Sequence, residues 1–343
     1  MRLLQLQMFS LLALFVFVFP AQADISYTPV THSELQAVYE DGTSYWTYLH
    51  PTSTRYPVSV VGIVINNPWE MLDYSSSASS PAWQTFIQAI NPNDYGISYP
   101  NWSDFGGTAL YMRRYSPRGS TNDYTAEEWQ SEMERVNWPL GLSELSLRYG
   151  DVVLVQAKAP GMFFRGKYNI NEQHYKSSDY DFSITILARG VTPSVATITL
   201  ADLKDASNDF IFDATRQTGC EHYQAGLVHL DNLLLLDPEN WALDGTVHVT
   251  QVGFEDRTFD LKLGIDPALA TIDAEMLTTT PFSITAILDQ EAYSGDNTEG
   301  YRFWLTNAQG LMAIPEPSGM LLLVMGGAAI VAGLAGKRFR RQR

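Results

Sequence analysis

The sequence predicts an all-β protein made of barrels or sandwiches, with few short helices. The first observation is a set of short apolar runs rich in Val, Ile and Thr. The clearest of them, at 56–65, ends in the turn signal Asn66-Asn67-Pro68. The second observation is that helical periodicity is sparse. The third is the length of 343 residues, 45% of them hydrophobic, which suffices for the cores of about two domains.

Ten segments carry the strand pattern, five in each half of the chain. They are 56–65, 84–89, 108–113, 151–157, 183–187, 197–200, 226–236, 246–252, 258–263 and 282–288. Residues 246–250 alternate polar and apolar side chains, which predicts one buried and one solvent-facing side. Turns of Gly, Pro and Asn separate the segments and favour barrels over alternating strands and helices. A helix is predicted at 125–133, where Thr125 and Glu128 have capping-box spacing, and a short turn at 201–204.

An internal echo predicts two related domains. The segment FSITIL at 182–187 recurs as FSITAIL at 282–288, late in each half of the chain. We therefore expect a first β domain at 24–190 and a second at 191–312, joined near 189–193.

The first 23 residues have the features of a secretory signal peptide. Arg2 forms a short positive region, and residues 3–19 are apolar. Ala21 and Ala23 then occupy the small-residue positions of a cleavage site, so processing would leave Asp24 first. An uncleaved membrane anchor is the alternative.

The C-terminal region, 313–343, combines three features in a fixed order. Pro315, Glu316 and Pro317 precede an apolar run at 319–336, long enough to span about 27 Å as a helix. A basic tail at 337–343 follows, and it predicts that the body lies outside the cytoplasm. The basic residues of this tail are Lys337, Arg338, Arg340, Arg341 and Arg343.

This order resembles the PEP-CTERM sorting signal. The resemblance implies that an exosortase-type enzyme processes the protein. The precursor would be held in the inner membrane by the C-terminal transmembrane helix, and the product would reach the cell surface or the extracellular space. The resemblance also implies exopolysaccharide as a partner, because members of the group occur in bacteria that make it. The alternative is an ordinary C-terminal anchor that is never cut.

The body carries a second resemblance. The motifs V-x-G-x-V at 60–64, F-x-Q at 86–88 and G-D-x-V-x-V at 150–155 look like strands of the OB-like barrels of exported bacterial proteins. Residues 221–230 resemble the entry to a second such module. This resemblance, over 55–265, implies two tandem OB-like or Greek-key β domains. Some relatives accompany nuclease domains and contact nucleic acid, but the charge of this body argues against such an activity.

The charge of the body is strongly acidic. Six of the 22 basic residues lie in the two terminal segments, so 24–318 holds 16 basic and 38 acidic residues, a net charge of −22. A body of this charge lacks the basic groove with which proteins bind single-stranded nucleic acid, so we expect no nucleic-acid partner. Acidity also serves solubility.

Three segments are candidate chemical sites. Cys220 and His222 would share one face of a strand, which permits a Cys/His nucleophile, but we expect a partly buried thiol beside a hydrogen-bonded His. Residues 169–174 are polar and suit either a ligand loop or turns. An acidic loop suits Ca²⁺ weakly, and we expect it to be solvated instead. Its residues are Asp289, Glu291, Asp296, Asn297 and Glu299.

The sequence contains no nucleophile elbow, zinc-protease or Walker motif, so we expect no enzyme activity and no cofactor. The first hypothesis is a non-enzymatic surface or matrix protein. Trp69, Trp83 and Trp102 would be candidates for stacking on sugar rings, although most aromatic residues should lie in the core. A secreted hydrolase acting on glycan or nucleic acid and an acidic partner-binding module are the alternatives.

Overall fold

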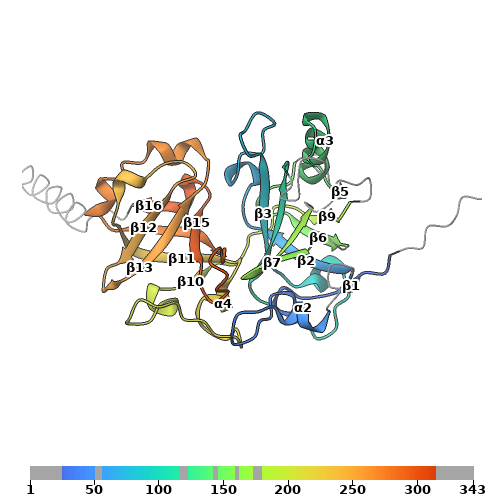
Figure 1. Ribbon diagram of the computed structural model, residues 1–343, viewed down its shortest axis with the longest axis horizontal. Helices are drawn as coiled ribbons and strands as arrows, with labels where there is room; N and C mark the ends of the chain where they lie inside the picture. Colours follow the sequence, from blue (N-terminus) through green and yellow to red (C-terminus); the bar gives the residue numbers. More distant parts are fainter. Residues whose placement is uncertain are drawn as a thin grey trace, which may run out of the picture.

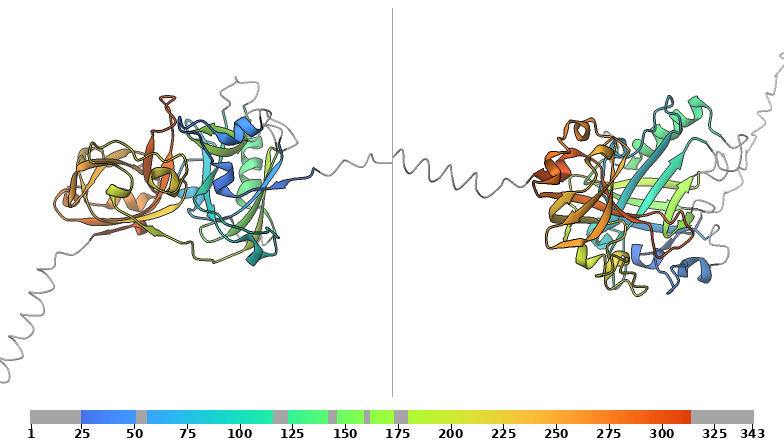
Figure 2. Two further views of the ribbon diagram at one scale, coloured as in Figure 1. Left: turned by 90° about the horizontal axis from the view of Figure 1, so that it is seen from below. Right: turned by 60° about the vertical axis from the view of Figure 1, so that its left-hand side comes forward.

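The computed structural model describes residues 25–50, 56–115, 123–141, 146–158, 162–172 and 180–313. These residues form two β-rich bodies that lie side by side along the longest axis of the molecule (Figures 1 and 2). One sheet is built from strands between Thr28 and Ala188, and the other from strands between Ala196 and Ala313. The described chain therefore has the all-β architecture predicted from its strand pattern.

The first sheet is an open, curved array in the order β5-β9-β6-β2-β3-β4-β8-β7, and β1 pairs with β2. Adjacent strands are antiparallel except for the parallel pairs β1–β2, β4–β8 and β5–β9. The strands are β1 Thr28–Pro29, β2 Val58–Val64, β3 Ala82–Ala89, β4 Gly107–Arg113, β5 Leu140–Gly141, β6 Val152–Ala157, β7 Met162–Arg165, β8 Lys167–Glu172 and β9 Phe182–Ala188.

The second sheet closes into a five-stranded barrel. Its core order is β11-β12-β13-β15-β14, and β14 pairs back onto β11, with β13 and β15 parallel. This is the strand order of an OB-like Greek-key barrel. The strands are β10 Ala196–Thr197, β11 Leu227–Leu235, β12 Thr246–Gln251, β13 Phe254–Leu263, β14 Phe282–Gln290, β15 Tyr301–Leu305 and β16 Leu311–Ala313.

Few helices interrupt the strands. The α-helices are α1 His32–Leu35, α2 Tyr45–Leu49, α3 Ala126–Asn137 and α4 Gly219–Tyr223. The 3-10 helices are η2 Pro68–Glu70, η3 Pro92–Tyr95, η5 Leu200–Asp202, η6 Pro238–Asn240, η7 Pro267–Thr271, η8 Met276–Thr278 and η9 Ala308–Gly310. The predicted capping box of α3 is confirmed, because the Thr125 hydroxyl accepts from the Glu128 amide and the Glu128 carboxylate accepts from the Thr125 amide.

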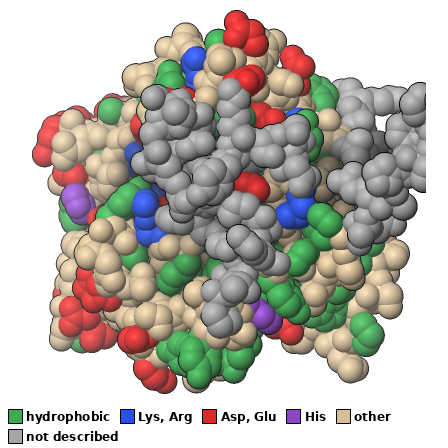
Figure 3. Space-filling view, turned by 45° about the vertical axis from the view of Figure 1, so that its right-hand side comes forward, with side chains coloured by type: hydrophobic (Ala, Val, Ile, Leu, Met, Phe, Trp, Pro, Cys, Tyr) green, Lys and Arg blue, Asp and Glu red, His purple; other side chains and the backbone are tan. Residues whose placement is uncertain are grey.

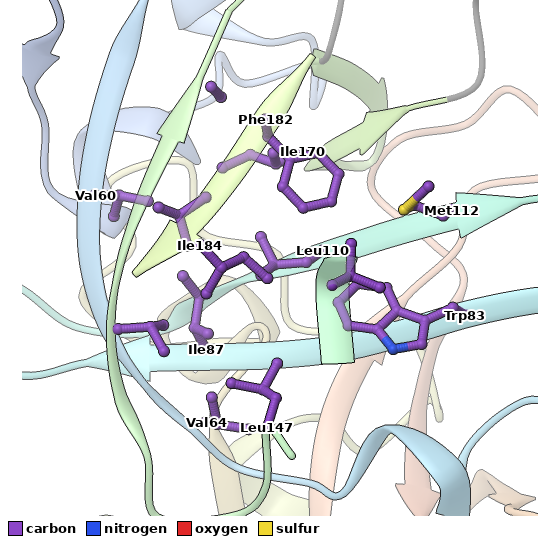
Figure 4. Close-up of a cluster of buried hydrophobic side chains, with 14 of the residues drawn as sticks. Val60, Val64, Trp83, Ile87, Leu110, Met112, Leu147, Ile170, Phe182 and Ile184 are labelled. Carbon is purple, nitrogen blue, oxygen red and sulfur yellow. The ribbon is translucent and has the colours of Figure 1, made fainter. Parts of the chain in front are cut away.

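Each body has its own apolar core. In the first, side chains from β2, β3, β4, β8 and β9 meet in one buried cluster (Figure 4). Helix α3 joins this core, burying Trp129, Met133 and Val136. In the second, the closed barrel encloses Phe259, Phe282 and further Leu, Val and Phe side chains. Burial of this apolar surface is the main favourable contribution to folding.

The strand predictions succeed wherever apolar runs are long, and fail where they are short or polar. Nine of the ten predicted segments overlap a long strand, while 197–200 contributes only the end of β10 before η5 begins. No predicted segment covers β8 or β15, nor the shorter strands β1, β5, β7 and β16. In β8, Tyr168 and Ile170 enter the core while the intervening Asn169 is also buried, so the 169–172 part of the predicted loop is strand.

The echo between 182–187 and 282–288 does not mark equivalent strands. The second copy, β14, pairs with β11, the first long strand of its barrel. The first copy, β9, pairs with β6 and β5, and it is β6 that pairs with β2, the first long strand of its sheet. The repeated letters therefore reflect a shared strand pattern, because Val, Ile and Thr recur wherever a half-buried strand is needed.

Candidate functional site

A continuous apolar cluster joins the two bodies. It contains residues of the first sheet, including Ile63 and Phe86, and residues of the second barrel, including Ile287 and Trp304. The rings of Phe86 and Trp304 meet edge to face, with centroids 6.5 Å apart. We call the contact region around this cluster the seam.

A buried ion-pair group lies at the seam. The Lys167 ammonium, at the start of β8, is 2.8 Å from a carboxylate oxygen of Asp289 in β14, and both side chains are fully buried. The other Asp289 oxygen is 2.8 Å from the Arg302 guanidinium. Burial alone would raise the pKa of the Asp289 carboxyl, but the attraction of Lys167 and Arg302 outweighs it and holds the pKa below its usual range.

A second buried polar network crosses the seam near α4. The Arg216 guanidinium donates to the carbonyl of Gln36 in the first body over 2.6 Å, and lies 3.7 Å from the Glu221 carboxylate. Glu221 also accepts from the Tyr301 hydroxyl, over 2.5 Å, and from the Gln224 amide, over 3.1 Å. Burial raises the pKa of Glu221 even though Arg216 opposes the shift. These contacts partly compensate the cost of burying the charges, while Arg216 Nε and Nη2 and Glu221 Oε2 make no hydrogen bond with the described residues.

The backbones of the two bodies approach closely at Gly107. Its amide donates to the Gln224 carbonyl over 3.0 Å, so the first residue of β4 is bonded to the second body. A Cβ at this position would lie 2.2 Å from the Ala225 carbonyl oxygen and 2.5 Å from that of Ile87. Gly107 therefore allows the close contact between the two backbones, which any larger residue would obstruct.

A cleft of about 300 Å³ opens between the bodies beside this contact. Its polar and aromatic walls include Gln88, Asp104, Phe105, Ser194, His222 and Tyr223. Several of these groups already have structural partners. Gln88 bonds to Ser194 and to the Leu227 amide, and Asp104 accepts from the amides of His32 and Ser33 at the start of α1. Gln88 thus links the first body to residues 194 and 227 of the second, while Asp104 fixes the start of α1 within the first body.

Cys220 and His222 do not form a nucleophile pair. The segment is helix α4 and not a strand, so the predicted shared face is wrong. The Cys220 thiol is fully buried and donates to the Leu203 carbonyl, and burial raises its pKa well above the usual value. His222 bonds through Nδ1 to the Arg216 carbonyl and stacks on Phe105. The expected hydrogen-bonded His is present, whereas the thiol, expected to be partly buried, is fully buried.

The acidic residues predicted to form one loop lie in different elements of the structure. Asp289 belongs to β14 and is buried between two cations, and Glu291 lies near Arg165 and Lys167. Asp296 accepts bonds from Thr298 in an exposed turn. Within the described parts of the chain, no group of three or more His, Cys, Asp or Glu side chains has the arrangement of a metal site.

The residues predicted to direct sorting fall outside the described ranges. They are Ala21, Ala23, Pro315, Glu316, Pro317, Lys337, Arg338, Arg340, Arg341 and Arg343. The predicted span at 319–336 is outside as well, and within the ranges that the structure describes no helix is long and apolar enough to cross a membrane. Of the three tryptophans considered for sugar stacking, Trp83 is fully buried, Trp102 is half-buried and Trp69 is 43% exposed.

Comparison with known proteins identifies no family. No family model matches the chain, and no curated protein matches it. Among solved structures, a replication protein A heterotrimer bound to single-stranded DNA aligns over 88% of this chain and 72% of its own, with 9% identity and a TM-score of 0.21. Similarity at that level carries no argument about this protein.

Proposed function

We propose that this chain is a non-enzymatic protein of the bacterial cell surface or extracellular matrix, delivered through a PEP-CTERM signal and associated with exopolysaccharide. The observation that carries the proposal is the pairing of a signal-like N-terminus with the Pro-Glu-Pro, apolar and basic order of the C-terminus. An exosortase-type enzyme would act on an inner-membrane precursor, as in the proteins that the signal resembles.

The geometry of the body supports such a role. In Figure 1, β1 and β16 lie toward opposite ends of the longest axis, so the first and last described strands belong to opposite ends of the body. The buried ion pairs of the seam join the two bodies into one extended unit.

The surface charge supports an extracellular, non-nucleic-acid role. On the face shown in Figure 3, acidic side chains are more widespread than basic ones, in keeping with the net charge of −22 over 24–318. An acidic surface repels phosphate-rich polymers and anionic lipid headgroups.

Sorting is tested in cells that make an exosortase. We expect the full chain to be shortened at its C-terminus and to leave the inner membrane. Substituting Glu316→Ala, or deleting 337–343, should leave the unshortened form in the membrane fraction on an immunoblot. Glu239→Ala, in a turn of the second barrel, is the matched control and should be processed normally. Normal release of both sorting variants would refute the proposal.

A further inference from the structure

A second hollow, separate from the cleft beside Gly107, lies where the turn before α2 meets the barrel of the second body. It has a volume of about 420 Å³ and is lined by Tyr39, Ser44, Thr47, Tyr48, Phe164 and Asn297, together with Thr43. Tyr48 is 71% exposed, an unusually high value for so large a ring. The rings of Tyr39 and Tyr48 meet at 90° with centroids 5.6 Å apart. This aromatic groove therefore presents ring surface to solvent and holds it in a fixed arrangement.

Both walls of the groove are held in place by contacts between the two bodies. Gly42 has φ +71°, and a Cβ there would lie 2.7 Å from the backbone carbon of Asn297, so the turn and the Asn297 loop pack backbone to backbone. The Gln290 amide donates to the carbonyls of Asn297 and Glu299, which anchors that loop to β14. A groove whose walls are fixed in advance loses little conformational entropy when it binds a ligand.

Polar groups line the groove together with the rings. The Ser44 hydroxyl accepts from the Thr47 amide, and the Thr47 hydroxyl lies 3.2 Å from the Tyr168 hydroxyl. A hydroxyl has one donor and two acceptor positions, so those of Ser44 and Thr47 retain capacity for a further bond. Asn297 lines the groove, and its side-chain amide makes no hydrogen bond with the described residues, so its two donors and its acceptor retain capacity for a ligand.

Charge restricts the kind of ligand. None of the lining residues is basic. Asp41 and Asp296, each next to a lining segment, are exposed, and hydrogen bonds from Thr43 and Thr298 lower the pKa of their carboxyls. Both carboxylates are therefore ionised at neutral pH and repel anionic polymers. Flat apolar faces next to hydroxyl and amide groups match a neutral pyranose ring, which has C–H faces and a rim of hydroxyls.

We infer that this aromatic groove is the carbohydrate-binding site of the protein and takes a hexose ring of a neutral polysaccharide, with Tyr48 stacking on the ring and Asn297 bonding its hydroxyls. The inference rests on the proposed association with polysaccharide and adds to it the site and the class of polymer. Because Tyr48 belongs to the first body and Asn297 to the second, the site exists only when the seam is intact.

The test is affinity electrophoresis of the full-length chain in detergent, through gels containing dextran, galactomannan, alginate or chitosan. We expect retardation by a neutral polymer, dextran or galactomannan, and a loss of about three- to tenfold in affinity for Tyr48→Ala, the range for one aromatic contact. Asn297→Ala should also weaken retardation. Tyr149→Ala removes a ring that is 44% exposed but lies outside the groove, and it should bind as the wild type does.

The outcomes separate the inference from the function on which it rests. Retardation by a neutral polymer that Tyr48→Ala and Asn297→Ala leave unchanged would overturn the groove assignment and keep the polysaccharide association. Retardation only by alginate or only by chitosan would overturn the choice of a neutral ring. No retardation of the wild type by any of the polymers would overturn both. Circular dichroism of each variant confirms folding, which substitution of an exposed Tyr48 should not disturb.

Discussion

Replacing Lys167 with methionine tests whether the seam holds the protein together. The substitution keeps the length and apolar stem of the side chain but removes its charge. The Asp289 carboxylate then loses a partner 2.8 Å away in a fully buried position, while the Lys167 bond to the Gln290 carbonyl is lost as well. Arg302 remains 2.8 Å from the second oxygen of Asp289, so the carboxylate keeps one partner.

The expected magnitude follows from this arrangement. Breaking a buried ion pair by removing one member costs about 3–5 kcal/mol, and the remaining Arg302 places Lys167→Met near the lower limit, about 3 kcal/mol. For a domain of 150–250 residues this corresponds to a fall in melting temperature of about 6–12 °C. Lys262→Met is the matched control: Lys262 pairs with Asp244, whose side chain is 60% exposed, and its loss should cost less than about 1 kcal/mol.

The assay is urea unfolding of the wild type, Lys167→Met, Asp289→Asn and the double variant. We expect the double variant to be less destabilised than the sum of the single variants, with a coupling of about 0.5–3 kcal/mol. A loss below about 1 kcal/mol for Lys167→Met, or additive effects in the double variant, would refute the assignment of Lys167 as a stabilising contact of the seam.

Three further predictions concern a helix cap, a glycine and a histidine. Thr125→Ala should destabilise α3 by about 0.5–2 kcal/mol in thermal unfolding, whereas Thr125→Ser should restore most of the loss, because serine keeps the capping hydroxyl; equal losses would contradict the capping account. Gly107→Ala should lower the melting temperature and increase proteolysis at the seam, since its Cβ would lie 2.2 Å from the Ala225 carbonyl oxygen; an unchanged melting curve would show that the contact is not required. The hydrogen bond from His248 to Asp237 raises the pKa of His248, although partial burial opposes the shift. The stabilisation from this bond is therefore complete below the unfolded pKa of about 6.5, and it is lost as pH rises through the higher pKa of the folded protein. Proton NMR titration should show the raised pKa, and a titration at or below 6.5 would contradict this account. Substituting His248→Gln should remove this part of the pH dependence of unfolding, which is below about 1 kcal/mol because the His248 side chain is half exposed.

Local pattern was enough to predict most of the strands and the capped helix. The run at 56–65 contains β2, and Thr125 caps α3 as its spacing to Glu128 indicates. Both are decided within a few residues by alternation, side-chain shape and backbone hydrogen bonding. Strand β8 escaped prediction because its buried Asn169 breaks the apolar pattern, and only parallel pairing with β4 places it in the sheet.

By itself the sequence determined the all-β class, the strand segments, the acidity of the body and the two distinctive ends. Each of these is carried by neighbouring residues or by composition. The tertiary structure alone decided the closure of the second barrel, the seam and the aromatic groove. Lys167 and Gln290, 123 residues apart in the chain, meet because two sheets curve and pack against each other. Long-range register of that kind depends on the simultaneous packing of many side chains, and no local pattern encodes it.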